Sequence, residues 1–374
     1  MGYFENVKKN FGFGCMRLPL LENGEVDIEQ FKEMVDLFIE SGFNYFDTAH
    51  GYLDGKSERA LKAALTSRHD RSEYILADKL TTFFFNKKEE VRPFIESQLE
   101  ICGVDYFDFY LMHAQSESIY AKFKKCEAFE EAYKLKEEGK IKHFGMSFHD
   151  RPEILDMILS EHPEIEFVQI QFNYIDYEDP AIQSKKCYEI ARKYNKPLII
   201  MEPVRGGNLV NLPEKAKKVL EDLHGGSEAS YALRFVNDFD GIFMILSGMS
   251  SLDQLKDNIS IMSNPKKLTK EEKEAIAKVV DILIETHLIP CTGCRYCVAG
   301  CPKKIAIPDL FACMNTTHMY KSWNAGYYYN LHTEHAGKAS DCIKCGKCEQ
   351  ACPQHLKIRS LLVDVAKEFE QPQK

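Results

Sequence analysis

Two cysteine-rich stretches near the end of the chain have residue types and spacing that suit metal chemistry. They are CTGCRYCVAGCP at residues 291–302 and CIKCGKCEQACP at residues 342–353, and both follow the pattern C-x-x-C-x-x-C-x-x-x-C-P. Zinc is usually held by two C-x-x-C pairs on separate arms, whereas three thiolates on one short loop suit one face of an iron–sulfur cubane. The repeated spacing therefore predicts two [4Fe–4S] clusters, which carry one electron at a time.

This part of the chain resembles the bacterial two-cluster ferredoxins, in which the fourth cysteine of each array ligates the cluster of the other array. The resemblance implies two ligand sets, Cys291, Cys294, Cys297 and Cys352 for one cluster and Cys342, Cys345, Cys348 and Cys301 for the other. The spacer between the arrays, residues 303–341, is longer than a compact ferredoxin needs and contains MNTTHMYKSWNAGYYYNLH. We expect its aromatic residues to pack the small domain against the rest of the chain, or else to cover the active site or bind a partner.

A second group of reactive side chains lies in the first third of the chain. Asp47 lies in NYFDTAHGY, and Tyr52 follows it five residues later. Lys79 ends the stretch YILADK, and His113 ends the stretch YFDFYLMH. A carboxylate, a phenol, an ammonium group and an imidazole that met at one place would form a proton-transfer unit.

The hydrophobic pattern predicts the scaffold that would bring these four residues together. Short β-branched or aromatic runs alternate with amphipathic helical stretches, and the predicted strands are 12–18, 44–48, 74–79, 106–113, 141–147, 166–173, 197–203 and 241–247. Eight such units in about 260 residues favour a closed (β/α)₈ TIM barrel of the α/β class. No G-x-G-x-x-G motif follows an early strand, which counts against an open dinucleotide-binding sheet. Catalytic residues of such barrels lie where strands end, as these four do.

The chain is expected to have two domains joined by a helix. We predict the barrel over residues 1–265, a charged helical linker over 266–288 that carries the chain away from the barrel, and a ferredoxin-like two-cluster domain over 289–374. The composition changes to Cys, Gly and Tyr from Ile289 onwards.

Composition and charge narrow the class of protein. The chain has 374 residues, a net charge of -9 and no concentration of Lys and Arg, so neither a nucleic-acid partner nor an anionic membrane is expected. The first residues lack an apolar segment of signal-peptide length, and we expect a cytoplasmic protein. Eight of the thirteen cysteines fall into the two arrays, which fits reduced thiolates that bind metal better than a disulfide framework, and the other five are expected to be packing residues.

The four reactive residues resemble the catalytic tetrad of the aldo/keto reductases. D-T-A-x-x-Y with a strand-end lysine and a strand-end histidine matches that family, as do GFGCMRLP (12–19), GMSFH (145–149), EPVRGG (202–207) and LSGMSSLDQLKDN (246–258). The resemblance extends over most of residues 10–265, and the whole chain is similar to the branch of the family with a ferredoxin-like domain. It implies that Tyr52 donates a proton to a carbonyl oxygen, that Lys79, held by Asp47, stabilises the phenolate, and that His113 orients the substrate.

Two glycine-containing loops are expected to hold a nicotinamide cofactor. Barrels often bind phosphate through the loops after strands seven and eight, here residues 204–207 and 247–250. Together with the resemblance, these loops imply nucleotide contacts from Met16, Arg17, Ser147, Gln169, Arg205, Gly206, Ser247, Gly248, Met249, Gln254 and Asn258. NADPH-specific relatives usually place a lysine and an arginine where this chain has Gly248 and Gln254, so NADH gains weight beside NADPH, although Lys256 could compensate.

The sequence thus predicts an oxidoreductase that reduces an aldehyde or ketone, or catalyses the reverse reaction, with NADH or NADPH. The two clusters would form an electron-transfer module, or would serve as a structural staple for the small domain. One alternative is an enzyme in which ferredoxin, another electron carrier or a bound flavin feeds the barrel site through the clusters, although no residue indicates a flavin. An alternative of another class is a non-catalytic redox-sensing or docking subunit.

Overall fold

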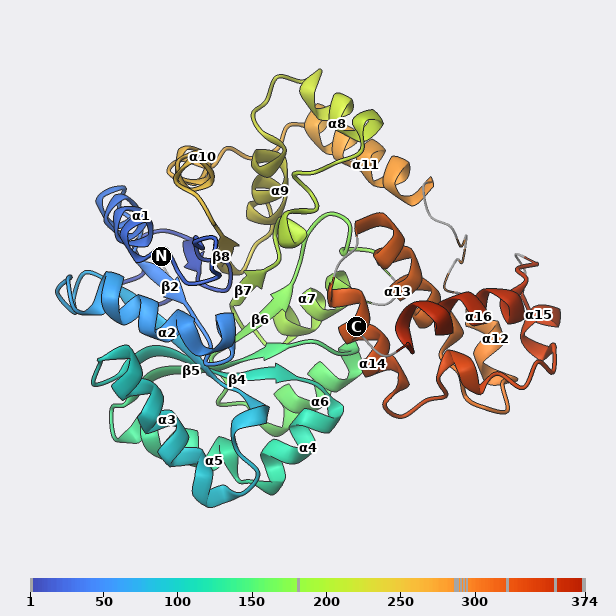
Figure 1. Ribbon diagram of the computed structural model, residues 1–374, viewed down its shortest axis with the longest axis horizontal. Coiled ribbons are helices and arrows are strands. Elements are labelled where there is room, and N and C mark those ends of the chain that lie inside the picture. The colour runs from blue at the N-terminus through green and yellow to red at the C-terminus, as the bar shows by residue number, and fades with distance from the viewer. Residues whose placement is uncertain are drawn as a thin grey trace.

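A closed barrel of parallel strands forms the larger part of the molecule (Figure 1). The computed structural model describes residues 3–179, 182–285, 289, 291, 293, 295–320, 323–352 and 355–371. In these ranges the strands run in the order β1 (Phe11–Gly14), β2 (Tyr45–Asp47), β3 (Ile75–Leu80), β4 (Phe107–Gln115), β5 (Ile141–Phe148), β6 (Phe167–Gln171), β7 (Leu198–Met201) and β8 (Ile242–Gly248), and β1 pairs with β8. The prediction of a TIM barrel is confirmed.

Helices surround the barrel and cover the outer faces of its strands (Figure 1). They are α1 (Ile28–Glu40), α2 (Lys56–Leu61), α3 (Lys88–Cys102), α4 (Glu117–Lys125), α5 (Ala128–Glu137), α6 (Pro152–Glu161), α7 (Ser184–Lys193), α8 (Glu214–Glu221), α9 (Glu228–Asn237), α10 (Leu252–Met262) and α11 (Lys270–Glu285). Helix α1 begins where the Asp27 carboxylate accepts a hydrogen bond from the Gln30 backbone N–H at 3.0 Å. It buries Phe31, Val35 and Phe38 against the barrel because these residues recur at helical spacing.

The interior of the barrel is filled by aromatic side chains at the end where the strands begin. Tyr45, Phe109, Phe167 and Phe243 belong to one buried cluster. Phe4, which precedes β1, adds its ring to the cluster and lies 5.0 Å from Phe109 between ring centroids. This end is therefore closed by packing, which leaves the carboxyl ends of the strands as the open mouth.

Helix α11 differs from the expectation that it would carry the chain away from the barrel. Its residues Ile276, Val279 and Leu283 pack in one buried cluster with Ala216 and Leu220 of α8. The Arg234 guanidinium of α9 also forms an ion pair with Glu272 of α11, at 2.5 Å. The amphipathic pattern that predicted a helix here thus provides an apolar face that the barrel's own helices bury.

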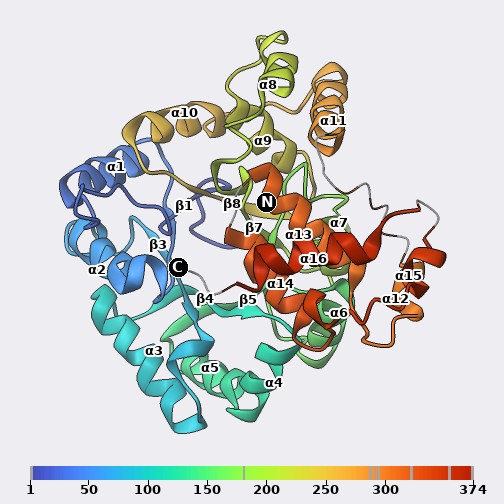
Figure 2. The ribbon, with the colours of Figure 1, turned by 45° about the vertical axis from the view of Figure 1, so that its right-hand side comes forward.

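The C-terminal domain lies beside the barrel (Figure 2). It has a hydrophobic core of its own. Its helices are α12 (Tyr296–Ala299), α13 (Ile307–Tyr320), α14 (Trp323–Thr333), α15 (Lys347–Gln350) and α16 (Ile358–Phe369). Cys297, Cys348 and Cys352 lie in this core together with Leu310 and Phe311 of α13. Among all described residues, no helix combines the length and apolar character needed to cross a membrane.

Candidate active site

The four predicted catalytic residues line one pocket at the barrel mouth. The pocket has a volume of about 780 Å³, and Asp47, Tyr52, Lys79 and His113 all contribute to its wall. Asp47 is the last residue of β2, and Lys79 lies near the end of β3, beside Leu111 of β4 in the strand register. Parallel strands end at the same rim of a barrel, so side chains far apart in the sequence converge there.

Lys79 and Asp47 form a buried ion pair at the floor of the pocket. The Lys79 ammonium lies 2.6 Å from Asp47 Oδ1 and donates a second hydrogen bond to the Thr48 carbonyl oxygen at 2.6 Å. Burial, the largest single influence, lowers the pKa of Lys79, but Asp47 together with Tyr52 and Asp78 raises it above its usual value. Burial also raises the pKa of Asp47, and the Lys79 ammonium opposes that shift. Lys79 therefore carries a fixed positive charge at neutral pH.

Tyr52 lies beside this charge with its phenol protonated. It begins the short 3₁₀ helix Tyr52–Gly55 in the loop that follows β2, and the Lys79 ammonium lies 4.8 Å from the centre of its ring. Burial raises the pKa of Tyr52, and Lys79 lowers it by a smaller amount. The phenol thus retains a proton that it can donate, while a cation stands ready to stabilise the phenolate that donation leaves.

His113 faces Tyr52 across the pocket as a neutral imidazole. The two rings lie 6.1 Å apart and nearly perpendicular, at 79°. Burial, together with the nearby Lys79 charge, lowers the pKa of His113 well below its usual value. The Thr81 hydroxyl lies 2.6 Å from His113 Nδ1. When this hydroxyl donates its proton to Nδ1, the Nε2–H of the neutral ring is free to donate to a substrate oxygen.

Most of the predicted nucleotide contacts also reach this pocket. The residues that line it are Met16, Arg17, Ser147, Gln169, Gly206, Ser247, Gly248, Gln254 and Asn258. Gly206 has a left-handed φ of 62°, and a Cβ atom there would lie 3.0 Å from the Arg17 guanidinium. The glycine therefore leaves room for a group to approach both the loop backbone and Arg17.

Two of the predicted nucleotide contacts point elsewhere. Met249 is fully buried in the main hydrophobic core. Arg205 turns away from the pocket, and its guanidinium pairs with Asp176 at 3.0 Å and donates to the Thr316 hydroxyl of α13 at 3.3 Å. From sequence alone, an arginine next to two glycines predicts a phosphate contact. In the structure the backbone of Arg205 is left-handed, with φ of 48°, and its side chain has the different orientation described above.

The pocket wall has polar atoms that fit the carboxamide of a nicotinamide. Gln169 Oε1 is buried without a hydrogen-bond partner among the described residues. Ser147 Oγ accepts a hydrogen bond from the Ala114 backbone N–H at 2.7 Å, so its own proton remains available. An unpaired acceptor beside an available donor matches an amide, which offers an N–H and a carbonyl oxygen.

Carboxylates line the part of the pocket that contains Gln254 and Asn258. Asp253 and Asp257 project from the same helix, α10, and Glu228 of α9 lines the pocket as well. Lys256, which could have compensated for the missing cations, is exposed on α10 and is not part of the pocket wall. Carboxylates at this place can accept hydrogen bonds from hydroxyl groups.

The four predicted ligands of one cluster share a cavity in the structure. Cys342, Cys345 and Cys348 of the second array line a small cavity together with Cys301 of the first array. Of the other predicted ligands, Cys297 and Cys352 are buried, Cys291 is partly buried, and Cys294 lies outside the described residues.

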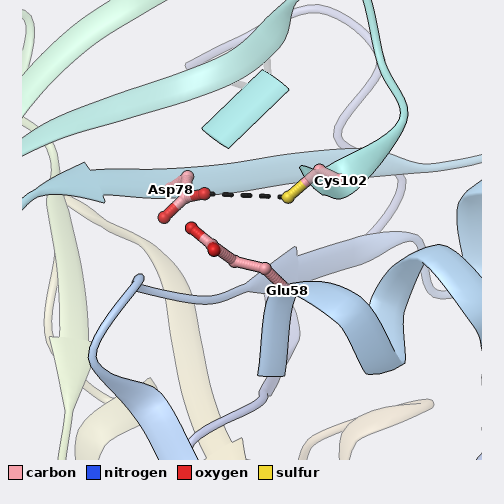
Figure 3. A group of neighbouring side chains, drawn as sticks. All are labelled: Glu58, Asp78 and Cys102. Atoms are coloured by element: carbon pink, nitrogen blue, oxygen red, sulfur yellow. Dashed lines mark hydrogen bonds between the residues drawn. The ribbon is translucent and has the colours of Figure 1, made fainter. Parts of the chain in front are cut away.

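A buried acidic group, which no local sequence pattern indicates, includes the residue next to Lys79 in the chain. Figure 3 shows the Glu58 carboxylate of α2 pointing towards Asp78 of β3, which Cys102 of α3 contacts as well, and one ligand atom from each of the three lies within 4.8 Å of the others. Glu58 accepts hydrogen bonds from Gln98 Nε2 at 3.0 Å and pairs with His50 Nδ1 at 2.8 Å. Burial, followed by the nearby Glu58 charge, raises the pKa of Asp78 well above its usual value. Asp78 is thus expected to be protonated at neutral pH.

The proton on Asp78 predicts a specific pH dependence of stability. Above about pH 3.9, Asp78 keeps its proton in the folded protein but loses it when the protein unfolds. Its contribution to the free energy of unfolding therefore falls as pH rises from about 4. Asp78→Asn keeps a donor towards Glu58 and an acceptor for the Lys79 backbone N–H, which now donates to Asp78 Oδ1 at 2.8 Å. The variant cannot lose a proton, so its Tm relative to the natural protein should increase between pH 5 and pH 8, as followed by circular dichroism.

Glu131→Gln is the matched control for this measurement. Burial raises the pKa of Glu131, but hydrogen bonds from Arg92 and Lys134 lower it below the usual value overall. Stabilisation by such a carboxylate is already complete above pH 5, so the Tm difference for this variant should be negative and nearly constant. Parallel curves for the two variants would contradict a protonated Asp78.

The closed barrel and the ionisable residues that line the pocket at its mouth form the arrangement of a TIM-barrel enzyme site. Residues 10–281 match the model of the aldo/keto reductase family, and residues 290–356 match a 4Fe-4S dicluster domain. The chain belongs to the aldo/keto reductase family, as an NAD(P)H-dependent oxidoreductase with a C-terminal iron–sulfur domain.

Individual relatives agree with this assignment over the barrel. An uncharacterized oxidoreductase of Bacillus subtilis, YqkF, is 26% identical over 300 residues, which cover 71% of this chain and 90% of the relative. The NADH-specific methylglyoxal reductase of Escherichia coli is 24% identical over 284 residues, covering 64% and 85%. The holo form of the aldo-keto reductase AKR11C1 from Bacillus halodurans superposes with a TM-score of 0.58 at 26% identity, over 72% of this chain and 91% of that one.

Proposed function

We propose that this protein reduces an aldehyde or ketone, or catalyses the reverse reaction, by hydride transfer involving NADH or NADPH at the barrel mouth. The observation that carries the proposal is the convergence of Tyr52, the Lys79–Asp47 ion pair and neutral His113 in one pocket. The unpaired Gln169 Oε1 in the same pocket supports a nicotinamide beside them.

The chain's own residues divide the work on the substrate carbonyl. When bound, the nicotinamide supplies the hydride, and Ser147 and Gln169 hold its carboxamide. His113 donates a hydrogen bond from Nε2 to the carbonyl oxygen and so fixes the orientation of the substrate. Tyr52 transfers its phenolic proton to that oxygen, and Lys79 stabilises the resulting phenolate. Asp47 holds Lys79 in place through the 2.6 Å ion pair.

The charges around Gln254 favour NADH over NADPH. Asp253, Asp257 and Glu228 would repel a 2′-phosphate, whereas a carboxylate can accept a hydrogen bond from a ribose 2′-hydroxyl. Gln254 Oε1 already accepts a hydrogen bond from the Ser250 backbone N–H at 2.8 Å, so its position beside the pocket is fixed.

For the iron–sulfur domain we propose two [4Fe–4S] clusters with crossed ligand sets that exchange single electrons with a carrier such as ferredoxin. Cys301, Cys342, Cys345 and Cys348 would hold one cluster, and Cys291, Cys294, Cys297 and Cys352 the other. The cavity shared by the first four thiols supports the crossed arrangement. Cys345 is exposed, which would bring one cluster close to the surface, where a carrier could dock.

Nucleotide titration of anaerobically purified, cluster-replete protein tests the reductase proposal. We expect NADH to bind with a Kd about tenfold lower than that of NADPH, as measured by nucleotide fluorescence, and NADH to support aldehyde reduction. Gln254→Arg introduces a cation beside the ribose and should reverse the preference. Binding of neither nucleotide would disprove the proposal, and turnover with reduced ferredoxin but with neither nucleotide would favour the electron-fed alternative.

A further inference from the structure

Helix α14 of the iron–sulfur domain forms part of the wall of the active-site pocket. Asn324, Tyr327 and Tyr328 line the same pocket as Tyr52 and His113. The substrate end of the barrel mouth is thus completed by residues that lie between the two cysteine arrays.

A first hydrogen-bonded link fixes α14 to the barrel. The Tyr328 hydroxyl donates to Gln171 Oε1 at 3.1 Å and lies 3.4 Å from His149 Nδ1. Gln171 is the last residue of β6, and its amide nitrogen donates to Asp176 Oδ2 at 2.7 Å. Tyr328 itself is only 6% exposed, so this contact is shielded from water and holds α14 firmly.

A second link joins the neighbouring helix α13 to the same acidic residue. Arg205 pairs with Asp176 Oδ1 at 3.0 Å and donates to the Thr316 hydroxyl of α13 at 3.3 Å. Arg205 and Asp176 are both buried, where charge-assisted hydrogen bonds are strong. Asp176 therefore connects both helices of the spacer to the rim of the barrel.

The wall that α14 presents is aromatic and uncharged. The Tyr327 ring lies 5.5 Å from that of Tyr328, at 89°, and 5.6 Å from that of His149, at 68°. Burial lowers the pKa of His149 to about 4, so its imidazole is neutral at physiological pH. Ile119 and the exposed Phe83 add further apolar surface to the pocket. Perpendicular ring pairs of this kind offer edges and faces against which another flat ring packs well.

We propose that Tyr327, supported by Tyr328 and His149, recognises the aromatic ring of an aromatic aldehyde or ketone, so that the iron–sulfur domain selects the substrate of the barrel. This inference rests on the proposed carbonyl reduction and specifies its substrate class. It also gives the small domain a role in catalysis that requires no electron transfer: Tyr328 packs in the same core as Cys297, Cys348 and Cys352, so the structure around the cysteines also positions the wall.

A comparison of two matched aldehydes tests the proposal in the full-length, cluster-replete protein. Benzaldehyde and cyclohexanecarbaldehyde have equal numbers of carbon atoms, but only the first is aromatic. Tyr327→Leu keeps apolar bulk and removes the ring, and it should lower the ratio of kcat/KM for benzaldehyde to that for cyclohexanecarbaldehyde about tenfold. Comparing this ratio between proteins cancels the difference in intrinsic reactivity. Tyr327→Phe retains the ring and should keep the ratio within about twofold of the natural value.

Tyr329→Phe is the control on the same helix, because Tyr329 packs against Phe369 inside the small domain and is not part of the pocket wall. It should leave the ratio unchanged, and the iron content of each variant should equal that of the natural protein. If Tyr327→Leu loses iron, Tyr327→Met replaces it. An unchanged ratio in an iron-replete ring-free variant overturns the inference.

If the protein reduces neither aldehyde with either nucleotide, the proposed function is disproved. The aromatic recognition by Tyr327 is then tested by a binding measurement. Benzamide, titrated calorimetrically into the natural protein and Tyr327→Leu, should then bind about tenfold more weakly to the variant. Equal binding, or no binding to either protein, would count against an aromatic recognition wall.

Discussion

Replacing Tyr52 with phenylalanine is expected to lower kcat for carbonyl reduction by about 10² to 10⁴, the range that general acid catalysis supplies. The phenol is the group placed beside both Lys79 and His113, and burial keeps it protonated. Phenylalanine preserves the ring that contacts Lys79 but removes the proton. The loss should appear in kcat, whereas the Kd for NADH should change less than about threefold, because the hydroxyl acts mainly in the transition state.

The matched control is Tyr188→Phe, which removes a phenol that donates to the Asp240 carbonyl oxygen on the outside of the barrel. This variant should retain the natural kcat. Retention of more than about a tenth of kcat by Tyr52→Phe would show that another group donates the proton. A uniform loss of kcat and nucleotide affinity would instead indicate that Tyr52 supports the shape of the pocket.

Local patterns in the sequence were sufficient to predict the barrel. Each predicted strand corresponds to an observed one, because runs such as GIFMILS are apolar on both faces and are separated by amphipathic helices. The approximate position of Asp47, Lys79 and His113 followed from the rule that strand ends meet at one rim. Both predictions depend on the spacing of apolar residues and on the order of helices and strands, and both of these can be read from one sequence.

Features that depend on tertiary contacts were not predictable in the same way. Helix α11 has a charged sequence, and only the apolar residues of α8 reveal that its other face is buried. The orientation of Arg205 towards Thr316 depends on where the iron–sulfur domain lies. The spacer tyrosines were expected either to pack or to cover the site. Tyr328 does the first through its core contacts, and Tyr327 and Tyr328 both line the pocket. The proximity of Glu58 to Asp78 joins an outer helix to a strand, and no local pattern in the sequence indicates it.

The second large effect concerns Cys301, which lies in the first array but borders the cavity formed by Cys342, Cys345 and Cys348. If the ligand sets are crossed, Cys301→Ala should destroy the cluster of the second array and leave that of the first. We expect anaerobically purified Cys301→Ala to contain about half the iron of the natural protein and to lose one of two electron paramagnetic resonance signals on reduction. Cys313→Ala, which alters a buried cysteine outside both arrays, should retain all the iron.

Pairs of substitutions identify the cluster to which Cys301 belongs. Loss of one ligand already removes a cluster, so loss of a second ligand of the same cluster removes no further iron. The double variant Cys301→Ala with Cys345→Ala should therefore contain as much iron as Cys345→Ala alone. Cys301→Ala with Cys291→Ala should instead lose nearly all the iron, because each change would remove a different cluster. Uncrossed ligand sets predict the opposite result for both pairs. Since Cys301 belongs to the same array as Cys291 in sequence, additivity with Cys291 would show that folding, and not proximity along the chain, assigns its cluster.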